Sequence, residues 1–161
     1  AVSKWETTVG CPDISLLPVI AGYFGVSIDT LFEYDADRLA AVIDDIHRNY
    51  TEHFWNEPER AENILLDGIA RYPSADKLKA DLIELYVQYP EWDDAEDKAV
   101  RIAEKLISTS SGYFSVSSAK HDLAVIYLRR GDYRGTKRII DSMPVLWRSI
   151  FMTKCGAQRI C

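Results

Sequence analysis

The side chains that could do chemistry in this sequence are three histidines and the acids near them. Asp44 and His47 are three residues apart, so on a helix they would share a face and could hold a proton or metal ion between them. A metal site needs a third ligand, and His53 would lie elsewhere around the same helix. His121 and Asp122 are adjacent and would point in different directions. We therefore expect no metal site.

The sequence also gives no indication of a catalytic nucleophile or of a cofactor-binding motif. Cys155 and Cys161 have no histidine near them, and with Cys11 they make an odd number of cysteines without CxxC spacing, which is typical of reduced thiols. The sequence contains no Gly-rich phosphate loop, no G-x-S-x-G and no H-E-x-x-H. We expect no cofactor, and we predict that the protein is not an enzyme.

Charge is distributed unevenly along the chain. The total is -6, but residues 1–35 carry -4, residues 36–110 carry -8 and residues 111–161 carry +6. An acidic protein has no general attraction for nucleic acid, so any DNA binding must be local.

Five basic residues lie close together in the sequence of the positive segment. Arg134, Lys137 and Arg138 would share one helical face, just after Arg129 and Arg130. Two interpretations fit this face: an anion site for a DNA backbone or a peptide carboxylate, or an ordinary solvated surface.

The elements that must position these side chains are predicted to be helices only. Apolar residues recur at i, i+3, i+4 and i+7, as in Leu39, Val42, Ile43 and Ile46, and no strand-like alternation of useful length occurs. Signals that end one helix and begin the next follow these stripes. They are Tyr72-Pro73 with Ser74 as the next N-cap, Tyr89-Pro90 with Asp93-Asp94, and Gly131 with Asp132 as the next N-cap.

A weak repeat relates several of the helices. Ala61, Ala99 and Thr136 each precede apolar residues at +3 and +4, which gives a period of 37 to 38 residues and predicts stacked helix pairs. The segment "LAVIYLRRGDYRGTKRII" resembles the tetratricopeptide pattern, through Ala124, Tyr127, Gly131, Tyr133 and Thr136. Such pairs can form a concave groove for a peptide or protein ligand, in which Asn63, Arg101 or His121 would serve as polar anchors if they converge.

The first 35 residues resemble the second half of a Cro/lambda-repressor type helix-turn-helix domain, as in the XRE family of bacterial transcription regulators. The resemblance rests on Ser3-Lys4-Trp5-Glu6, Pro12-Asp13, Leu16-Leu17, Ala21, Phe24-Gly25-Val26-Ser27-Ile28-Asp29 and Leu31. It implies that Ser3, Lys4 and Thr7 face DNA from a recognition helix, because Trp5 and Val2 occupy its inner side.

The same stretch makes local predictions. Asp13 or Ser15 should cap a helix over residues 14–24, Gly25 should end it, and Ser27 should cap a short helix that follows.

The resemblance places residue 1 inside the recognition helix, so we expect this chain to be an N-terminally truncated part of its parent protein. Thr8 and Val9 also stand where the family has a glycine and a basic residue. We therefore predict that the parent protein binds double-stranded DNA and that this chain alone binds it poorly.

The expected fold is all-α. A helix-turn-helix remnant covers residues 1–35, a linking helix residues 36–56, and tetratricopeptide-like antiparallel helix pairs of an α-solenoid residues 57–161. No run of about 18 apolar residues and no signal-peptide pattern occurs, so we expect no membrane association and a cytoplasmic location.

The predicted function is sequence-specific transcription regulation by a bacterial homodimer, whose repeat domain dimerises or senses an effector. The alternative is a protein- or peptide-binding module without DNA binding of its own. The apolar C-terminal stretch that includes Trp147 and Phe151 would cap the last helix pair or meet its counterpart in a dimer.

Overall fold

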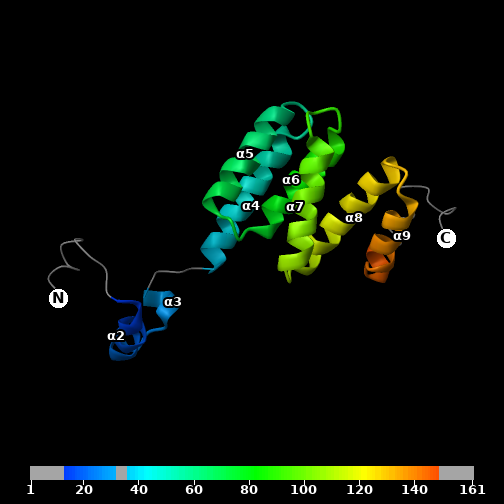
Figure 1. The fold of residues 1–161 in the computed structure, drawn as a ribbon. Helices are drawn as coiled ribbons and strands as arrows, with labels where there is room; N and C mark the ends of the chain where they lie inside the picture. Colours follow the sequence, from blue (N-terminus) through cyan, green and yellow to red (C-terminus); the bar gives the residue numbers. More distant parts are fainter. Residues whose placement is uncertain (1–12, 32–35, 149–161) are drawn as a thin grey trace. The chain divides into compact units, whose positions relative to one another are not determined.

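The computed structural model describes residues 13–31 and 36–148, and every regular element in these two ranges is a helix (Figure 1). The predicted all-α fold is confirmed. The chain divides into two compact units, residues 1–41 and 42–161. Within the described ranges, no helix combines the length and the apolar character that crossing a membrane requires.

Residues 13–31 of the first unit form three short helical elements. These are η1 (Ile14–Leu16), α2 (Leu17–Phe24) and α3 (Ile28–Leu31). Several of their ends lie at capping residues that the local sequence predicts. A carboxylate oxygen of Asp13 accepts the main-chain N–H of Ser15 at 2.9 Å, so Asp13 is the predicted cap, although the first turn is a 3-10 helix. Gly25 ends α2 in the left-handed conformation, with φ of 65°, which glycine adopts at little cost. The hydroxyl of Ser27 accepts the N–H of Thr30 at 3.0 Å, as predicted for the start of the next helix.

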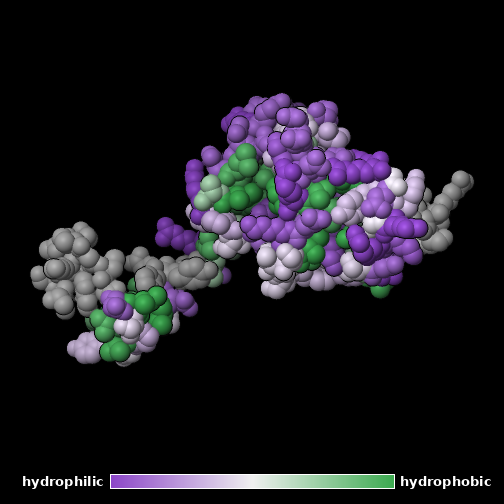
Figure 2. Space-filling model, viewed as in Figure 1, coloured by the Kyte–Doolittle hydropathy of each residue, from purple (hydrophilic) through white to green (hydrophobic). Residues whose placement is uncertain are grey.

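The described part of the first unit leaves most of its apolar side chains in solvent. Tyr23 is 85% exposed and Phe24 66% exposed, and Ile14 and Val19 are exposed as well. Within α2 only Ala21 is buried. Figure 2 shows this apolar surface over α2 and α3. An apolar patch of this kind is typical of a surface that meets another part of a protein.

The chain forms six helices between residues 36 and 141 that follow one another through short turns, the first of which begins before the boundary of the second unit, and residues 145–148 are helical in addition. The six helices are α4 (Ala36–His53), α5 (Pro58–Arg71), α6 (Asp76–Gln88), α7 (Ala95–Thr109), α8 (Tyr113–Arg129) and α9 (Tyr133–Asp141). From α5 onward each helix packs against the next, and α6 also packs against α8 (Figure 1). The core therefore lies around α6, which has neighbours on several sides.

Equivalent positions of the weak repeat are buried in the same way. Ala61 in α5, Ala99 in α7 and Thr136 in α9 have no exposed surface. Small side chains at these positions let α5, α7 and α9 approach neighbouring helices closely. The repeat that the sequence shows therefore coincides with a repeated packing position.

The stretch predicted as a linking helix over residues 36–56 corresponds to α4 and the turn after it. Tyr50 and Phe54 belong to the main hydrophobic core, and their rings meet edge to face with centroids 5.4 Å apart. The division between the two compact units falls inside α4, after Ala41, and not at its ends.

One of the three predicted helix starts lies at a different residue from the prediction, and a second lies at the predicted residue but without a side-chain cap. The N-cap of α6 is Ala75 instead of Ser74, and no side chain caps this helix. Asp94 is the N-cap of α7 in a left-handed conformation and its side chain makes no cap hydrogen bond. At α9 the prediction is confirmed: Gly131 has φ of 74°, and Asp132 accepts the N–H of Gly135 at 2.8 Å.

Candidate functional site

The residues predicted to read DNA, Ser3, Lys4 and Thr7, lie outside the described residues. The other predicted contacts, Arg134, Lys137 and Arg138, are exposed on α9. The ammonium group of Lys137 is 3.7 Å from a carboxylate oxygen of Asp141, one turn further along α9, in a solvent-exposed ion pair.

The two arginines that precede this face have partners in other helices. Arg130 donates to Asp97 at 2.7 Å and to Glu96 at 3.1 Å, and these hydrogen bonds raise the pKa of its guanidinium. Arg129 donates to the main-chain oxygen of Val87 at 2.6 Å. Both side chains thus fasten the end of α8 to α6 and α7, so Arg129 and Arg130 are engaged within the fold.

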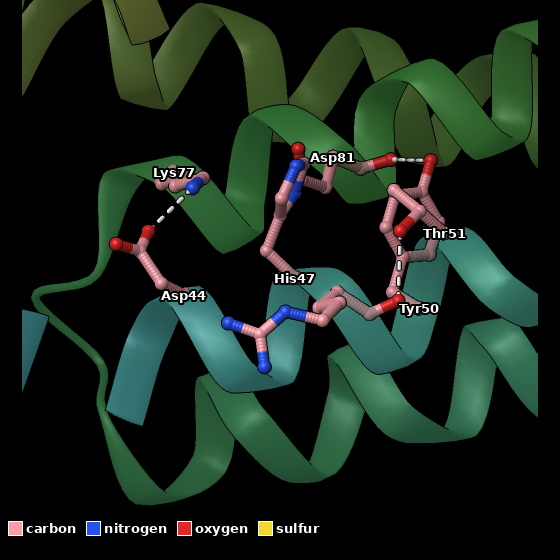
Figure 3. Close-up of polar contacts among 7 residues, drawn as sticks. Asp44, His47, Tyr50, Thr51, Lys77 and Asp81 are labelled. Carbon is pink, nitrogen blue, oxygen red and sulfur yellow. Dashed lines mark hydrogen bonds and ion pairs between the residues drawn. The ribbon is translucent and has the colours of Figure 1, made fainter. Parts of the chain in front are cut away.

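The histidine that sequence analysis paired with Asp44 has a different partner. His47 Nδ1 is 2.8 Å from a carboxylate oxygen of Asp81 in α6, and Asp44 accepts instead from Lys77 at 2.7 Å (Figure 3). The hydroxyl of Tyr50 also donates to the main-chain oxygen of Asp81, at 3.2 Å. These polar contacts join α4 to α6, so they position helices. Among the described residues, no three His, Cys, Asp or Glu side chains come together as metal ligands.

Burial governs the ionisation of this cluster. Asp81 is 8% exposed, and burial raises the pKa of its carboxyl although the contact with His47 opposes the rise. Burial also raises the pKa of Tyr50, with the nearby Glu84 acting in the same direction. The pKa of Asp44, in contrast, is lowered by its hydrogen bond from Lys77.

The clearest binding geometry lies elsewhere, between α5 and α7. Both helices pack against α6, and a groove of about 500 Å³, which we call the α5–α7 groove, opens between them above α6. Apolar side chains supply most of its surface: Leu66, Ile69, Leu82, Ile102 and Leu106. Figure 2 shows exposed apolar surface over α5 on this face of the molecule.

Three cations stand among these apolar side chains. Lys79 in α6 donates to Asp76 at 2.8 Å, so its charge is already partnered. Arg101 and Lys105 lie one turn apart on α7, are exposed, and form no ion pair with any of the residues that the structure describes. The α5–α7 groove therefore combines an apolar floor with two cations that are open to a ligand.

Only one of the three polar anchors considered from the sequence reaches this groove. Arg101 lines it, whereas Asn63 donates to the main-chain oxygen of Glu59 within its own helix, at 2.9 Å. His121 Nδ1 is 3.0 Å from Asp122, and its ring faces Trp147 with centroids 6.4 Å apart. The three side chains do not converge, because they lie on different helices and different faces.

Sequence reasoning did not identify Lys105, or the apolar side chains around it, as contacts of a ligand site. The i, i+4 spacing of Arg101 and Lys105 beside Ile102 and Leu106 was the available signal. Comparisons with protein-family models, with curated proteins and with solved structures found no match.

Proposed function

We propose that this chain belongs to a sequence-specific DNA-binding transcription regulator of the helix-turn-helix type, whose helical second unit senses an effector or pairs two copies. The observation that carries this proposal is local. Within the stretch that resembles this family, Asp13, Gly25 and Ser27 cap and end the helices of the first unit at the positions that local capping rules predict.

The exposure of the first unit supports the same proposal. Tyr23 and Phe24 would be costly to leave in water in an isolated unit, since full burial of a large apolar side chain stabilises by about 1.5–3 kcal/mol. Further helices of a helix-turn-helix domain would cover such a face. The proposal therefore assigns the first unit to a larger DNA-reading domain.

The second unit supports an effector or dimerisation role. We infer tetratricopeptide-like helix pairs because the buried small residues Ala61, Ala99 and Thr136 recur every 37 to 38 residues on the second helix of each pair. At its C-terminal end, Trp147 packs against the small cluster of Ala124, Ile140 and Met143, which supports a role in closing the last pair.

A second candidate function is a protein- or peptide-binding module without DNA binding of its own. The observation that favours it is the α5–α7 groove, which has the size of small-ligand sites and two cations without an ion-pair partner among the described residues. This groove is compatible with both candidates, because a regulator also needs an effector site. DNA binding is what separates them.

The test of the regulator is a selection of randomised DNA duplexes with the full-length gene product, followed by gel shifts at several salt concentrations. We expect one enriched DNA sequence. Lys4→Ala should weaken binding to that sequence and lower the slope of log affinity against log salt concentration by about one. Lys137→Ala is the matched control on α9 and should leave binding unchanged. A uniform loss with Lys137→Ala would place the DNA backbone at α9. If the selection enriches no sequence, the regulator proposal is contradicted and the binding module is the remaining candidate.

Self-association is measured on the same protein by light scattering. A regulator that reads two half-sites should have twice the mass of one chain, to which these 161 residues contribute 18.3 kDa. A monomer at all concentrations would favour the binding module.

A further inference from the structure

We propose that the α5–α7 groove binds an extended peptide segment in which apolar and acidic residues alternate. This inference rests on the proposed role of the second unit in binding an effector or partner, and it names the chemical class that the groove fits.

The floor of the groove selects apolar side chains. Its volume of about 500 Å³ lies in the range of sites that bury most of a small ligand. Leu66 lines the groove and is 43% exposed, so its side chain is accessible to a ligand. A ligand side chain placed against Leu66 and Ile102 would remove apolar surface from water on both partners.

The rim of the groove selects negative charge. Arg101 and Lys105 extend from one face of α7 and have no ion-pair partner among the described residues. They stand out within residues 36–110, a segment with a net charge of -8. These two positive charges are complementary to carboxylates of a ligand. Charges at the rim of a binding site contribute mainly to specificity for the partner.

The dimensions of the groove favour a short extended chain. The side chains that α7 contributes run from Arg101 to Thr109, which corresponds to about 12 Å along a helix. An extended peptide rises about 3.4 Å per residue, so three to four residues span that length. Because successive side chains alternate, residues i and i+2 would face the floor while i+1 and i+3 face the rim.

The experiment measures fluorescence anisotropy of labelled tetrapeptides with the full chain. The probe is acetylated and amidated Leu-Glu-Leu-Glu, and its controls are Leu-Lys-Leu-Lys and Ser-Glu-Ser-Glu. We expect saturable binding of the probe only, weaker at high salt because exposed ion pairs are screened. Binding of Leu-Lys-Leu-Lys with equal affinity, or no binding of any peptide, would overturn the inference.

Protein variants locate the site. Arg101→Glu with Lys105→Glu should lower probe affinity about tenfold or more, and the neutral pair Arg101→Gln with Lys105→Gln should do so less strongly. Arg134→Glu with Arg138→Glu is the matched control, because these arginines have the same spacing on an exposed face of α9. Leu66→Ser should weaken binding without affecting salt dependence. If the α9 pair weakens binding as much as the α7 pair, the groove is not the site.

Three further outcomes would replace the peptide with another occupant or separate the two proposals. Displacement of the probe by octanoate at lower concentration than by unlabelled peptide would identify a small carboxylate. Loss of self-association in the Arg101→Glu and Lys105→Glu variant would identify a second copy of the chain. The DNA selection experiment does not depend on this groove. If it enriches one DNA sequence while no peptide binds, the regulator proposal stands and only the proposed peptide ligand is refuted.

Discussion

Gly68 in α5 lies where side chains of α4 and α6 come close to the backbone of α5, and its substitution gives a specific stability prediction. A Cβ atom added at this position in α5 would lie 2.9 Å from Leu78 Cδ1 in α6 and 3.1 Å from Ile46 Cγ2 in α4. Leu78 has no exposed surface and Ile46 packs against the same core, so neither side chain can move into solvent. Glycine at this position serves packing, since its backbone conformation is helical.

The magnitude follows from two opposing effects. Alanine is favoured over glycine inside a helix by about 1 kcal/mol. Overpacking a dense core costs about 1–3 kcal/mol. We therefore expect Gly68→Ala to lower the free energy of unfolding by about 1 kcal/mol, and Gly68→Val to lower it further. With a urea dependence of about 2 kcal/mol per molar, the Gly68→Ala midpoint would fall by about 0.5 M.

The assay is urea unfolding followed by circular dichroism at 222 nm. Gly22→Ala is the matched control, because a Cβ at this helical position meets no atom within 4 Å and should not lower the midpoint. In a Leu78→Ala background, Gly68→Ala should cost less, with a coupling energy of about 0.5–3 kcal/mol. A midpoint that rises with Gly68→Ala would refute the argument, since helix propensity alone would then dominate.

Substitutions at three other positions test contacts of the second unit. Asp132→Ala removes the cap of α9 and should cost about 1 kcal/mol in urea unfolding, whereas Asp132→Asn should restore most of it. Tyr86→Phe removes the hydrogen bond from the tyrosine hydroxyl to Glu62, 2.7 Å long, and should cost about 0.5–1.5 kcal/mol; no loss would mean that water replaces it. Burial raises the pKa of Asp81 despite His47, so the folded state binds this proton more tightly, and stability falls as pH rises from near 3.8 through the raised pKa. Asp81→Asn should lack that fall when unfolding is compared from pH 4 to pH 7, and an equally steep fall would assign it to another group.

The outcome at the helix ends shows where local reasoning succeeds. Gly25 and Gly131 were identified as helix ends because a left-handed residue after a helix favours glycine, and both have positive φ. Ser74 was expected to cap α6 for an equally local reason, yet the helix begins after Ala75. The position of Tyr72 and Ala75, joined by a main-chain hydrogen bond of 2.9 Å, fixes the turn instead.

The candidate sites show where local reasoning fails. Asp44 and His47 were considered together because they are one turn apart, but each contacts a residue of α6 more than thirty positions away. Arg101 was noted as a polar anchor, while Leu66 across the groove was not. A sequence gives spacing within a helix and does not give the partner that the helix meets.

The sequence by itself determined the helical fold, the approximate ends of most helices and the repeated small residues, because each depends on neighbours within a few positions. Only the tertiary structure decided that α4 contributes Tyr50 to the core, that Asp81 is buried against His47, and that Arg101 stands open beside an apolar floor. Those features depend on how α4, α5 and α7 pack on α6. That packing is set by contacts summed over the whole unit, which no local pattern specifies.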